Sequence, residues 1–219
     1  MKKLYGIGTG PGDPDLLTLK AVKLIKSADK IFAPNNRGKN MALTTAQEYI
    51  NEEKLVLLDF PMGQTTKKTY KEAMEKINDL LEDGQNGVFL NIGDSMIYST
   101  FMNLVQAGEM DHFVFECVPG IPSFVAAANS IQKNLVAKGE NFLLADDPDR
   151  LVLDGVDSVA ILKTSKNLKG LLEKLEEADF AYYYVARVSF PDQLILVDKE
   201  EILEEKNYMS LLLARKKSL

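Results

Sequence analysis

Residues 5–21 read YGIGTGPGDPDLLTLKA, and this stretch decides how the N-terminal half of the chain folds. A short apolar run leads into a loop of glycines and prolines, after which apolar residues recur at helical spacing. We therefore expect a strand, a tight turn and a helix from about Thr18 to Ser27, with Thr18 as the N-cap. The glycines and prolines between strand and helix raise the question of which ligand the loop holds.

The alternation of strand and helix patterns continues to residue 118. Because helices separate the strands, we expect a parallel sheet that is covered on both faces. Pro34 should end the second strand, and Gly84 should close the long third helix. The expected strands are residues 30–34, 54–58, 87–93 and 113–118, and the expected helices are residues 41–50, 65–84 and 99–108.

After residues 118–120 the strands follow one another closely, which predicts antiparallel pairs and a mixed sheet. We therefore expect an α/β protein of two docked α/β domains, residues 1–117 and 118–219, with a cleft between them. The expected strands of the second half are residues 141–145, 158–163, 181–188, 193–197 and 209–216, and the expected helices are residues 122–132 and 167–178.

The composition disfavours several classes of protein. The net charge is −6, so we expect no basic surface and no nucleic-acid partner. Cys117 is the single cysteine, which rules out a disulfide within the chain and a cysteine metal cluster. No other grouping of residues indicates a metal site. No apolar run approaches the ~18 residues of a membrane span, so we expect no membrane partner and a cytoplasmic location.

The first glycine-rich stretch does not fit a dinucleotide fingerprint, which needs glycine at the first, third and sixth positions of the loop. Counted from Gly6 the sixth position is Pro11, and counted from Gly8 it is Asp13. Pro11 has no N–H to donate, and Asp13 places negative charge where a phosphate would lie. A nicotinamide enzyme is therefore disfavoured. The alternative is a turn with a purely structural role.

Two later stretches have the same character: NIGDSMIYST (91–100) and VPGIPSF (118–124). Gly93 allows backbone to approach a ligand, and Asp94 follows a buried strand at the end where open α/β sheets bind ligands. The structural alternative is an Asx-turn followed by a helix cap at Ser99. For the third stretch the alternative is a hinge between domains.

Taken together and in this order, the three stretches resemble the tetrapyrrole (corrin/porphyrin) methyltransferase family, whose members use S-adenosylmethionine. The stretches APNNRGKNMALTTAQ, DFPMGQTTKK and YSTFMNLV are similar to the branch that methylates C20 of precorrin-2 or cobalt-factor II in cobalamin synthesis. The resemblance implies two α/β domains with the methyl donor in the cleft, a tetrapyrrole acceptor and a homodimer. Any cobalt would travel in the acceptor.

The resemblance also implies donor contacts at matching positions. Two departures affect them. Ser95 replaces a common proline, which is expected to loosen its loop, and Ala186 and Ser189 flank Arg187-Val188 where this branch commonly has glutamate and glycine. The implied contacts are Pro11, Ile92, Gly93, Asp94, Ile97, Tyr98, Ser99, Thr100, Pro122, Ser123, Leu162, Lys163, Arg187 and Val188.

Methyl transfer from a sulfonium needs alignment more than a nucleophile, which agrees with a chain that has one histidine and no triad. The catalytic residues stay unassigned, since His112 is interpreted as a surface turn and Glu116 as structural. Tyr98 faces the acceptor, packs on the donor or belongs to the core. Arg37, Lys39, Lys67 and Lys68 either bind acceptor carboxylates or are solvated loop charges.

Two further functions stay open. One is methylation of a different corrin carbon by an enzyme of the same family. The other is binding of a tetrapyrrole or of S-adenosylmethionine without turnover, which the unusual Gly-Asp-Ser sequence favours.

Overall fold

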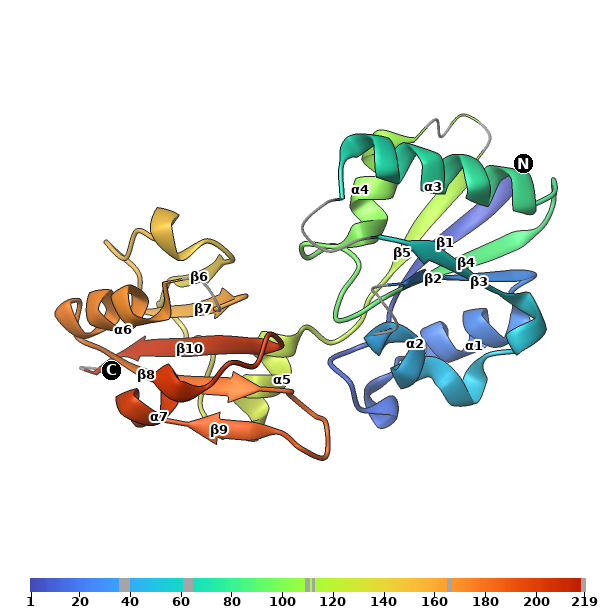
Figure 1. Cartoon of the computed structure of the whole chain (residues 1–219). Helices are drawn as coiled ribbons and strands as arrows, with labels where there is room; N and C mark the ends of the chain where they lie inside the picture. The colour runs from blue at the N-terminus through green and yellow to red at the C-terminus, as the bar shows by residue number, and fades with distance from the viewer. Residues whose placement is uncertain (36–39, 61–64, 109–110, 112, 165–166, 218–219) are drawn as a thin grey trace. The chain divides into compact units, whose positions relative to one another are not determined.

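The computed structural model describes residues 1–35, 40–60, 65–108, 111, 113–164 and 167–217. The chain divides into two compact units, Met1–Pro122 (unit 1) and Ser123–Leu219 (unit 2), and each is described by itself. Figure 1 shows a sheet with its own helices in each unit. The boundary expected between residues 117 and 118 falls within the last strand of unit 1, and the definition of the domains stays a proposal. No helix in the described ranges is long and apolar enough to cross a membrane.

Unit 1 contains a five-stranded sheet in the order β3-β2-β4-β1-β5. All of its strand pairs are parallel, as the alternating pattern predicted. Strand β4 is inserted between β1 and β2, an order that the local sequence pattern does not predict. The strands are β1 Lys2–Gly8, β2 Lys30–Asn35, β3 Leu55–Asp59, β4 Asn86–Asn91 and β5 Phe113–Val118.

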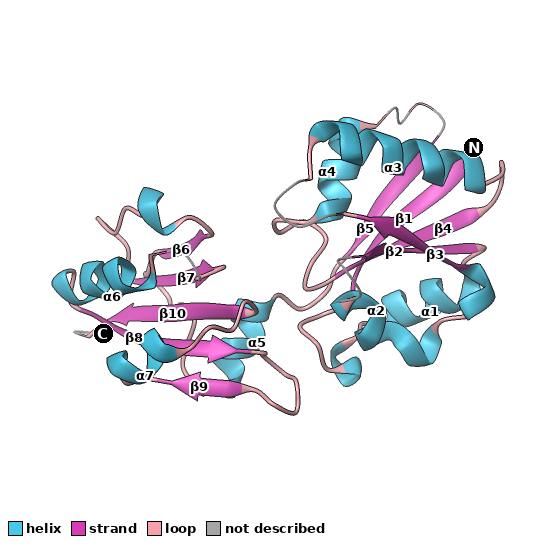
Figure 2. Cartoon of the chain, in the orientation of Figure 1, coloured by secondary structure: helices cyan, strands magenta, loops and turns pink. Residues whose placement is uncertain are grey.

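Helices cover both faces of this sheet (Figure 2). Helices α1 (Leu19–Ser27) and α2 (Met41–Ala46) bury one apolar face, around Ile7, Ile25 and Val88. Helices α3 (Lys67–Leu80) and α4 (Thr100–Ala107) cover the other face, where aromatic and aliphatic side chains form the core. That second core includes Phe32, Ile77, Phe89 and Phe101.

Neighbouring strands β1 and β4 send the chain to opposite faces of the sheet. From β1 the chain runs to α1, and from β4 it runs to α4. This divergence makes a topological switch point at the carboxyl ends of β1 and β4. Ligands of open α/β sheets bind at such points, because the two loops part there and leave room between them.

Several expected element ends in unit 1 are wrong, and the structure explains two of them. Strand β2 continues through Pro34 to Asn35, because beyond Phe32 it pairs only with β3 and tolerates a residue without an N–H there. Helix α3 ends at Leu80 rather than at Gly84, since Leu81 leaves the helix and is buried in the core. Gly84, with a φ of 86°, instead belongs to the turn before β4.

Unit 2 contains a second five-stranded sheet, in the order β6-β7-β10-β8-β9. β6 and β7 are parallel, whereas β10 is antiparallel to both β7 and β8, which confirms the mixed sheet. Helix α7, Lys199–Glu204, was not predicted, although Asp198 caps it by accepting from Glu201 N. The remaining elements are α5 Ser123–Ser130, β6 Phe142–Ala145, β7 Ser158–Leu162, α6 Leu168–Glu177, β8 Phe180–Ala186, β9 Leu194–Leu196 and β10 Ser210–Lys216.

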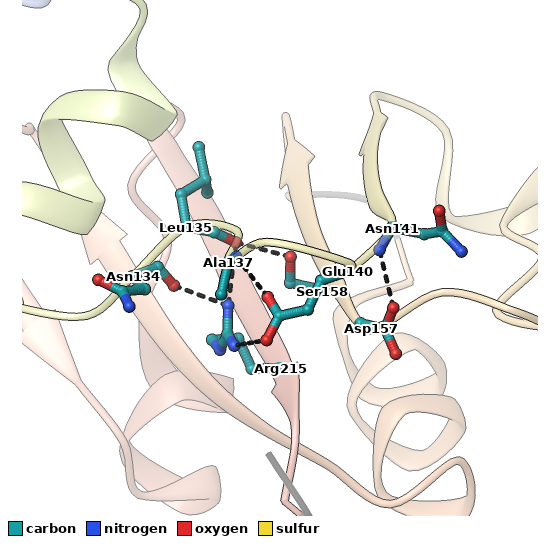
Figure 3. Close-up of polar contacts among 8 residues, drawn as sticks. All are labelled: Asn134, Leu135, Ala137, Glu140, Asn141, Asp157, Ser158 and Arg215. Atoms are coloured by element: carbon teal, nitrogen blue, oxygen red, sulfur yellow. Dashed lines mark hydrogen bonds and ion pairs between the residues drawn. The ribbon is translucent and has the colours of Figure 1, made fainter.

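The segment between α5 and β6 is fixed by Arg215 of β10 (Figure 3). Its guanidinium donates to Asn134 O at 2.9 Å and to Leu135 O at 3.2 Å, and pairs with Glu140 Oε1 at 2.7 Å. The second oxygen of Glu140 accepts from Ala137 N at 2.6 Å. One side chain of the central strand therefore holds a connection that has little regular structure.

Stability should depend on pH through Glu140. Its hydrogen bonds, first from Arg215 and then from Ala137 N, lower its pKa below the ordinary carboxyl value. The contribution of these Glu140 contacts to the free energy of unfolding is therefore complete above the pKa of a glutamate in the unfolded chain, about 4.3. It is lost as the pH falls through the pKa of Glu140 in the folded protein. We expect Glu140→Gln to lower the melting temperature at pH 7, with the difference from the parent protein shrinking below about pH 4. Thermal unfolding of both proteins across this range would measure it, and a difference that is constant with pH would contradict it.

Candidate functional site

Three loops meet at the carboxyl ends of β1, β4 and β5: a first loop (residues 9–18), a second loop (92–99) and a third loop (119–122). The first two are joined by a pair of backbone hydrogen bonds, Gly10 N to Gly93 O at 3.1 Å and Gly93 N to Gly10 O at 2.8 Å. The third loop is attached by Gly120 N, which donates to Asp94 Oδ2 at 3.0 Å. The three stretches singled out in the sequence therefore converge at the switch point.

Glycine is needed where these loops cross. A Cβ on Gly8 would lie 2.5 Å from Gly120 N and 2.7 Å from Gly93 O, and both are backbone atoms that cannot swing away. A Cβ on Gly120 would collide with the same oxygen of Gly93 and lie 2.6 Å from Gly8 C. At Gly93 itself, where φ is 68°, no atom lies within 4 Å of an added Cβ. The backbone at Gly93 is thus open on the side where a ligand can approach.

Asp94 links the second and third loops. Besides the bond from Gly120, its Oδ1 accepts from Met96 N at 2.8 Å, which is the geometry of an Asx-turn. Ser99 caps α4 by accepting from Met102 N at 3.1 Å. Both structural roles proposed for this loop are therefore present, and the Asp94 carboxylate is shared between two backbone donors.

The second loop presents apolar side chains to solvent. Ile92 is 42% exposed, Tyr98 is 48% exposed and Met96 is 64% exposed, whereas Pro11 of the first loop is buried. Tyr98 adopts a φ of 45°, in the left-handed region that is unfavourable for a tyrosine. Strained backbone of this kind clusters at ligand sites, so its position in this loop supports a binding role.

The candidates in unit 2 lie at one edge of its sheet. Leu162 ends β7 and Lys163 follows it, and Arg187 and Val188 follow β8. Both strands are antiparallel to β10, so their carboxyl ends lie at the same edge, with Leu162 opposite Leu211 and Ala186 opposite Ser210. Lys163 and Arg187 have φ values of 59° and 50°, so the chain turns sharply at both strand ends.

The two basic side chains at this edge already have acidic partners within unit 2. Lys163 Nζ lies 3.4 Å from Asp146 Oδ2. Arg187 Nε lies 2.5 Å from Asp192 Oδ2, and its guanidinium lies 4.9 Å from the centre of the Phe190 ring. The adjacent Arg187 guanidinium lowers the pKa of Asp192, which keeps that pair charged. Contacts of these residues with a ligand would therefore come more readily from the backbone.

The sequence matches the family of Tetrapyrrole (Corrin/Porphyrin) Methylases over residues 3–204. The chain belongs to this family. A probable cobalt-precorrin-2 C(20)-methyltransferase of Methanocaldococcus jannaschii is 33% identical, over 99% of this chain and 97% of the relative. The cobalt-precorrin-2 C(20)-methyltransferase of Salmonella typhimurium is 35% identical, over 58% of this chain and 55% of the relative.

The fold agrees with a solved member of the same family. The structure of uroporphyrin-III C-methyl transferase from Thermus thermophilus, complexed with S-adenyl homocysteine, superposes with a TM-score of 0.67. The identity is 18%, and the superposition covers 97% of each chain. The predicted fold class is therefore confirmed for this tetrapyrrole methylase.

Several side chains considered in the sequence have other partners in this methylase. Glu116 is exposed and forms an ion pair with Lys20 of α1, which supports its structural interpretation. Lys68 Nζ lies 3.6 Å from Glu72 Oε1, one turn further along α3. Lys67 is exposed at the start of that helix. Arg37, Lys39 and His112 lie outside the described residues.

Cys117 lies at the end of β5, with its Sγ 3.8 Å from Met102 Sδ. Burial raises the pKa of its thiol, and the charges of Asp94 and Glu116 add to the effect, so the thiol stays protonated at neutral pH. Within the described ranges, histidine, cysteine and acidic side chains form no group that could hold a metal ion.

Sequence reasoning missed Thr9 and Asn91, which are almost fully buried beside the three loops. Asn91 O accepts from both Thr9 N and Thr9 Oγ1, at 2.8 and 2.9 Å. The sequence did indicate Asn91, since it is a polar residue that follows the apolar run Val88-Phe89-Leu90 at the end of a strand. Ser95, expected to loosen the second loop, is buried as well and has hydrogen-bonding partners.

Proposed function

We propose that the chain transfers a methyl group from S-adenosylmethionine to C20 of precorrin-2 or cobalt-factor II in cobalamin synthesis. The observation that carries the proposal is the nearly full-length similarity to a relative named for C20 methylation of cobalt-precorrin-2. A second relative bears the same activity in its name, and both names favour the cobalt-containing acceptor.

The loops of unit 1 suit a sulfonium donor better than a phosphate. Their meeting point consists of glycine backbone, and the charged side chain at this point is Asp94, an anion. A carboxylate disfavours phosphate and favours a positively charged sulfur. The contacts that we propose are Pro11, Ile92, Gly93, Asp94, Ile97, Tyr98, Ser99, Thr100, Pro122 and Ser123, together with Leu162, Lys163, Arg187 and Val188 of unit 2.

The chemistry asks mainly for alignment. The donor supplies a methyl group already activated on sulfur, and the sulfur keeps the bonding electron pair as the new carbon–carbon bond forms. Holding both partners in line can contribute roughly 7–11 kcal/mol. Fixed loops serve this purpose, because the glycine contacts and the Asp94 hydrogen bonds leave the second loop little freedom. C20 then loses a proton to water or to a weak base.

Product analysis tests the activity. Incubation of the chain with S-adenosylmethionine and cobalt-factor II should add one methyl group by mass spectrometry, and NMR should place it on C20. Metal-free precorrin-2, tested side by side, shows which acceptor is preferred. A methyl group on another carbon would indicate a different corrin methylase of the same family.

Donor binding is tested separately by calorimetry. S-adenosylhomocysteine should bind at about one molecule per chain, and NADH should not bind. Binding of NADH in its place would contradict the proposal. Donor binding without methylation of any tetrapyrrole would favour a binding protein. A homodimer and a cytoplasmic location stay predictions, and sedimentation measures the first.

A further inference from the structure

Four buried polar side chains connect the first and second loops to helix α4: Thr9, Asn91, Ser95 and Ser99. Each is at most 8% exposed. They form one continuous hydrogen-bonded chain, in which Thr9 donates to Asn91 O, and Asn91 Nδ2 donates to Ser95 Oγ at 3.3 Å. Ser99 Oγ in turn donates to Ser95 O at 2.5 Å. This set of hydrogen-bonded side chains is here called the polar network.

Asn91 is the residue on which the polar network depends. Its Oδ1 accepts from Phe101 N at 3.2 Å, so it satisfies a backbone donor in the first turn of α4 while its amide nitrogen holds Ser95. Its own main chain pairs with Gly8 in the β1–β4 register. One side chain therefore holds both Ser95 of the second loop and the first turn of α4, and Asn91 itself is fixed in the sheet.

Because the polar network is buried, the loss of any of its hydrogen bonds is costly. A buried polar group that loses its partner retains the full cost of desolvation, and networks of this kind favour one conformation. Ser95 is matched to Asn91, because a proline at position 95 has no hydroxyl to accept from Asn91 Nδ2. The hydroxyl thus fixes the loop in a different way from the ring of a proline.

We propose that Asn91, acting through Ser95, is a positioning residue that sets the conformation of the second loop for binding the methyl donor. The proposal rests on the proposed function. Asn91 does not touch the donor, and it acts by holding the backbone from Gly93 to Ser99 in its binding conformation. Its removal should weaken donor binding and leave the affinity for the acceptor unchanged.

The test compares Asn91→Leu, Ser95→Ala and the double variant with the parent protein. Asn103→Leu is the matched control, because Asn103 is an exposed residue of α4 whose amide donates to Tyr70 OH at 3.2 Å. Three quantities are measured below the melting temperature of every variant: amide hydrogen exchange of residues 92–98, the Kd of S-adenosylhomocysteine, and the KM of cobalt-factor II.

We expect Asn91→Leu to raise the Kd of S-adenosylhomocysteine roughly tenfold, which lies within the range that the loss of its two side-chain hydrogen bonds gives. Exchange of the amides at 92–98 should accelerate in the unliganded protein, and the KM of cobalt-factor II should not change. The double variant should bind no more weakly than Asn91→Leu alone, because the two residues act as one pair. Asn103→Leu should match the parent protein in all three quantities.

A folded Asn91→Leu protein with parental donor affinity would overturn the proposal, as would effects of the two substitutions that simply add. If the proposed function itself is wrong, the result is different, because the parent protein would then not bind S-adenosylhomocysteine. Hydrogen exchange still distinguishes the cases, since it reports the conformation of the loop without any donor.

Discussion

Gly8→Ala is expected to abolish donor binding and to destabilise unit 1 by at least about 3 kcal/mol, the upper end of typical overpacking. The added methyl would lie within 2.8 Å of three backbone atoms, from two loops, and no side chain there can move aside. Accommodation would require the strand end and the loops to separate, and the backbone near Gly93 would then lose its present arrangement. Calorimetry with S-adenosylhomocysteine and thermal unfolding measure the two effects.

Gly139→Ala is the control for this substitution. Gly139 has a φ of 89°, and no atom lies within 4 Å of an added Cβ, so only backbone strain of about 1 kcal/mol is expected. Donor binding should be retained, because Gly139 belongs to unit 2 and lies outside the three loops. A Gly8→Ala protein that binds the donor with unchanged affinity would contradict the close packing of the loops.

Asp94→Ala is expected to weaken donor binding by 10-fold to 100-fold and to lower stability by about 2 kcal/mol. Two backbone donors, Met96 N and Gly120 N, lose a charged acceptor, and hydrogen bonds to charged groups contribute about 1.5–3 kcal/mol each when they are not exposed. The expected loss of stability is set below the sum of two such bonds, because Asp94 is partly exposed. Isothermal calorimetry and denaturant unfolding measure the two quantities.

Asp94→Asn separates the two hydrogen bonds. The amide keeps an oxygen for Met96 N but offers an NH2 group to Gly120 N, so only the link to the third loop is lost. Asp147→Ala is the control, because Asp147 Oδ1 accepts from Asp149 N at 3.1 Å in a similar turn of unit 2, outside the three loops. Unchanged donor affinity in both Asp94 variants would leave Asp94 with a local structural role only.

Local sequence patterns predicted most of the elements, because strand alternation and helix caps are short-range signals. Thr18 caps α1 by accepting from Ala21 N, and Ser99 caps α4, both as expected. The errors arose where tertiary packing decides the outcome. Leu81 left its helix to enter the core, and Pro34 was tolerated because one side of β2 is unpaired at that point.

The site was predicted less completely than the fold. The three glycine stretches were recognised, and their convergence follows from parallel strands that end at one edge. Their mutual contacts were not predictable, since the insertion of β4 between β1 and β2 is what brings Gly93 beside Gly8 and Gly10. Asn91 was missed because its hydrogen-bonding partners cannot be recognised from local sequence. Thr9 is distant in sequence, and Ser95 belongs to the turn that Asn91 supports. The donor contacts themselves stay a prediction.

The central strand of unit 2 is also the last of its five strands to be synthesised. β10, residues Ser210–Lys216, separates β7 from β8, so those two strands have open edges until it emerges. The sheet of unit 1 needs nothing beyond residue 118 and can form earlier during translation. A nascent chain therefore carries unpaired edges on β7 and β8 from the synthesis of each strand until β10 emerges, and this is the period in which chaperones would be needed against aggregation.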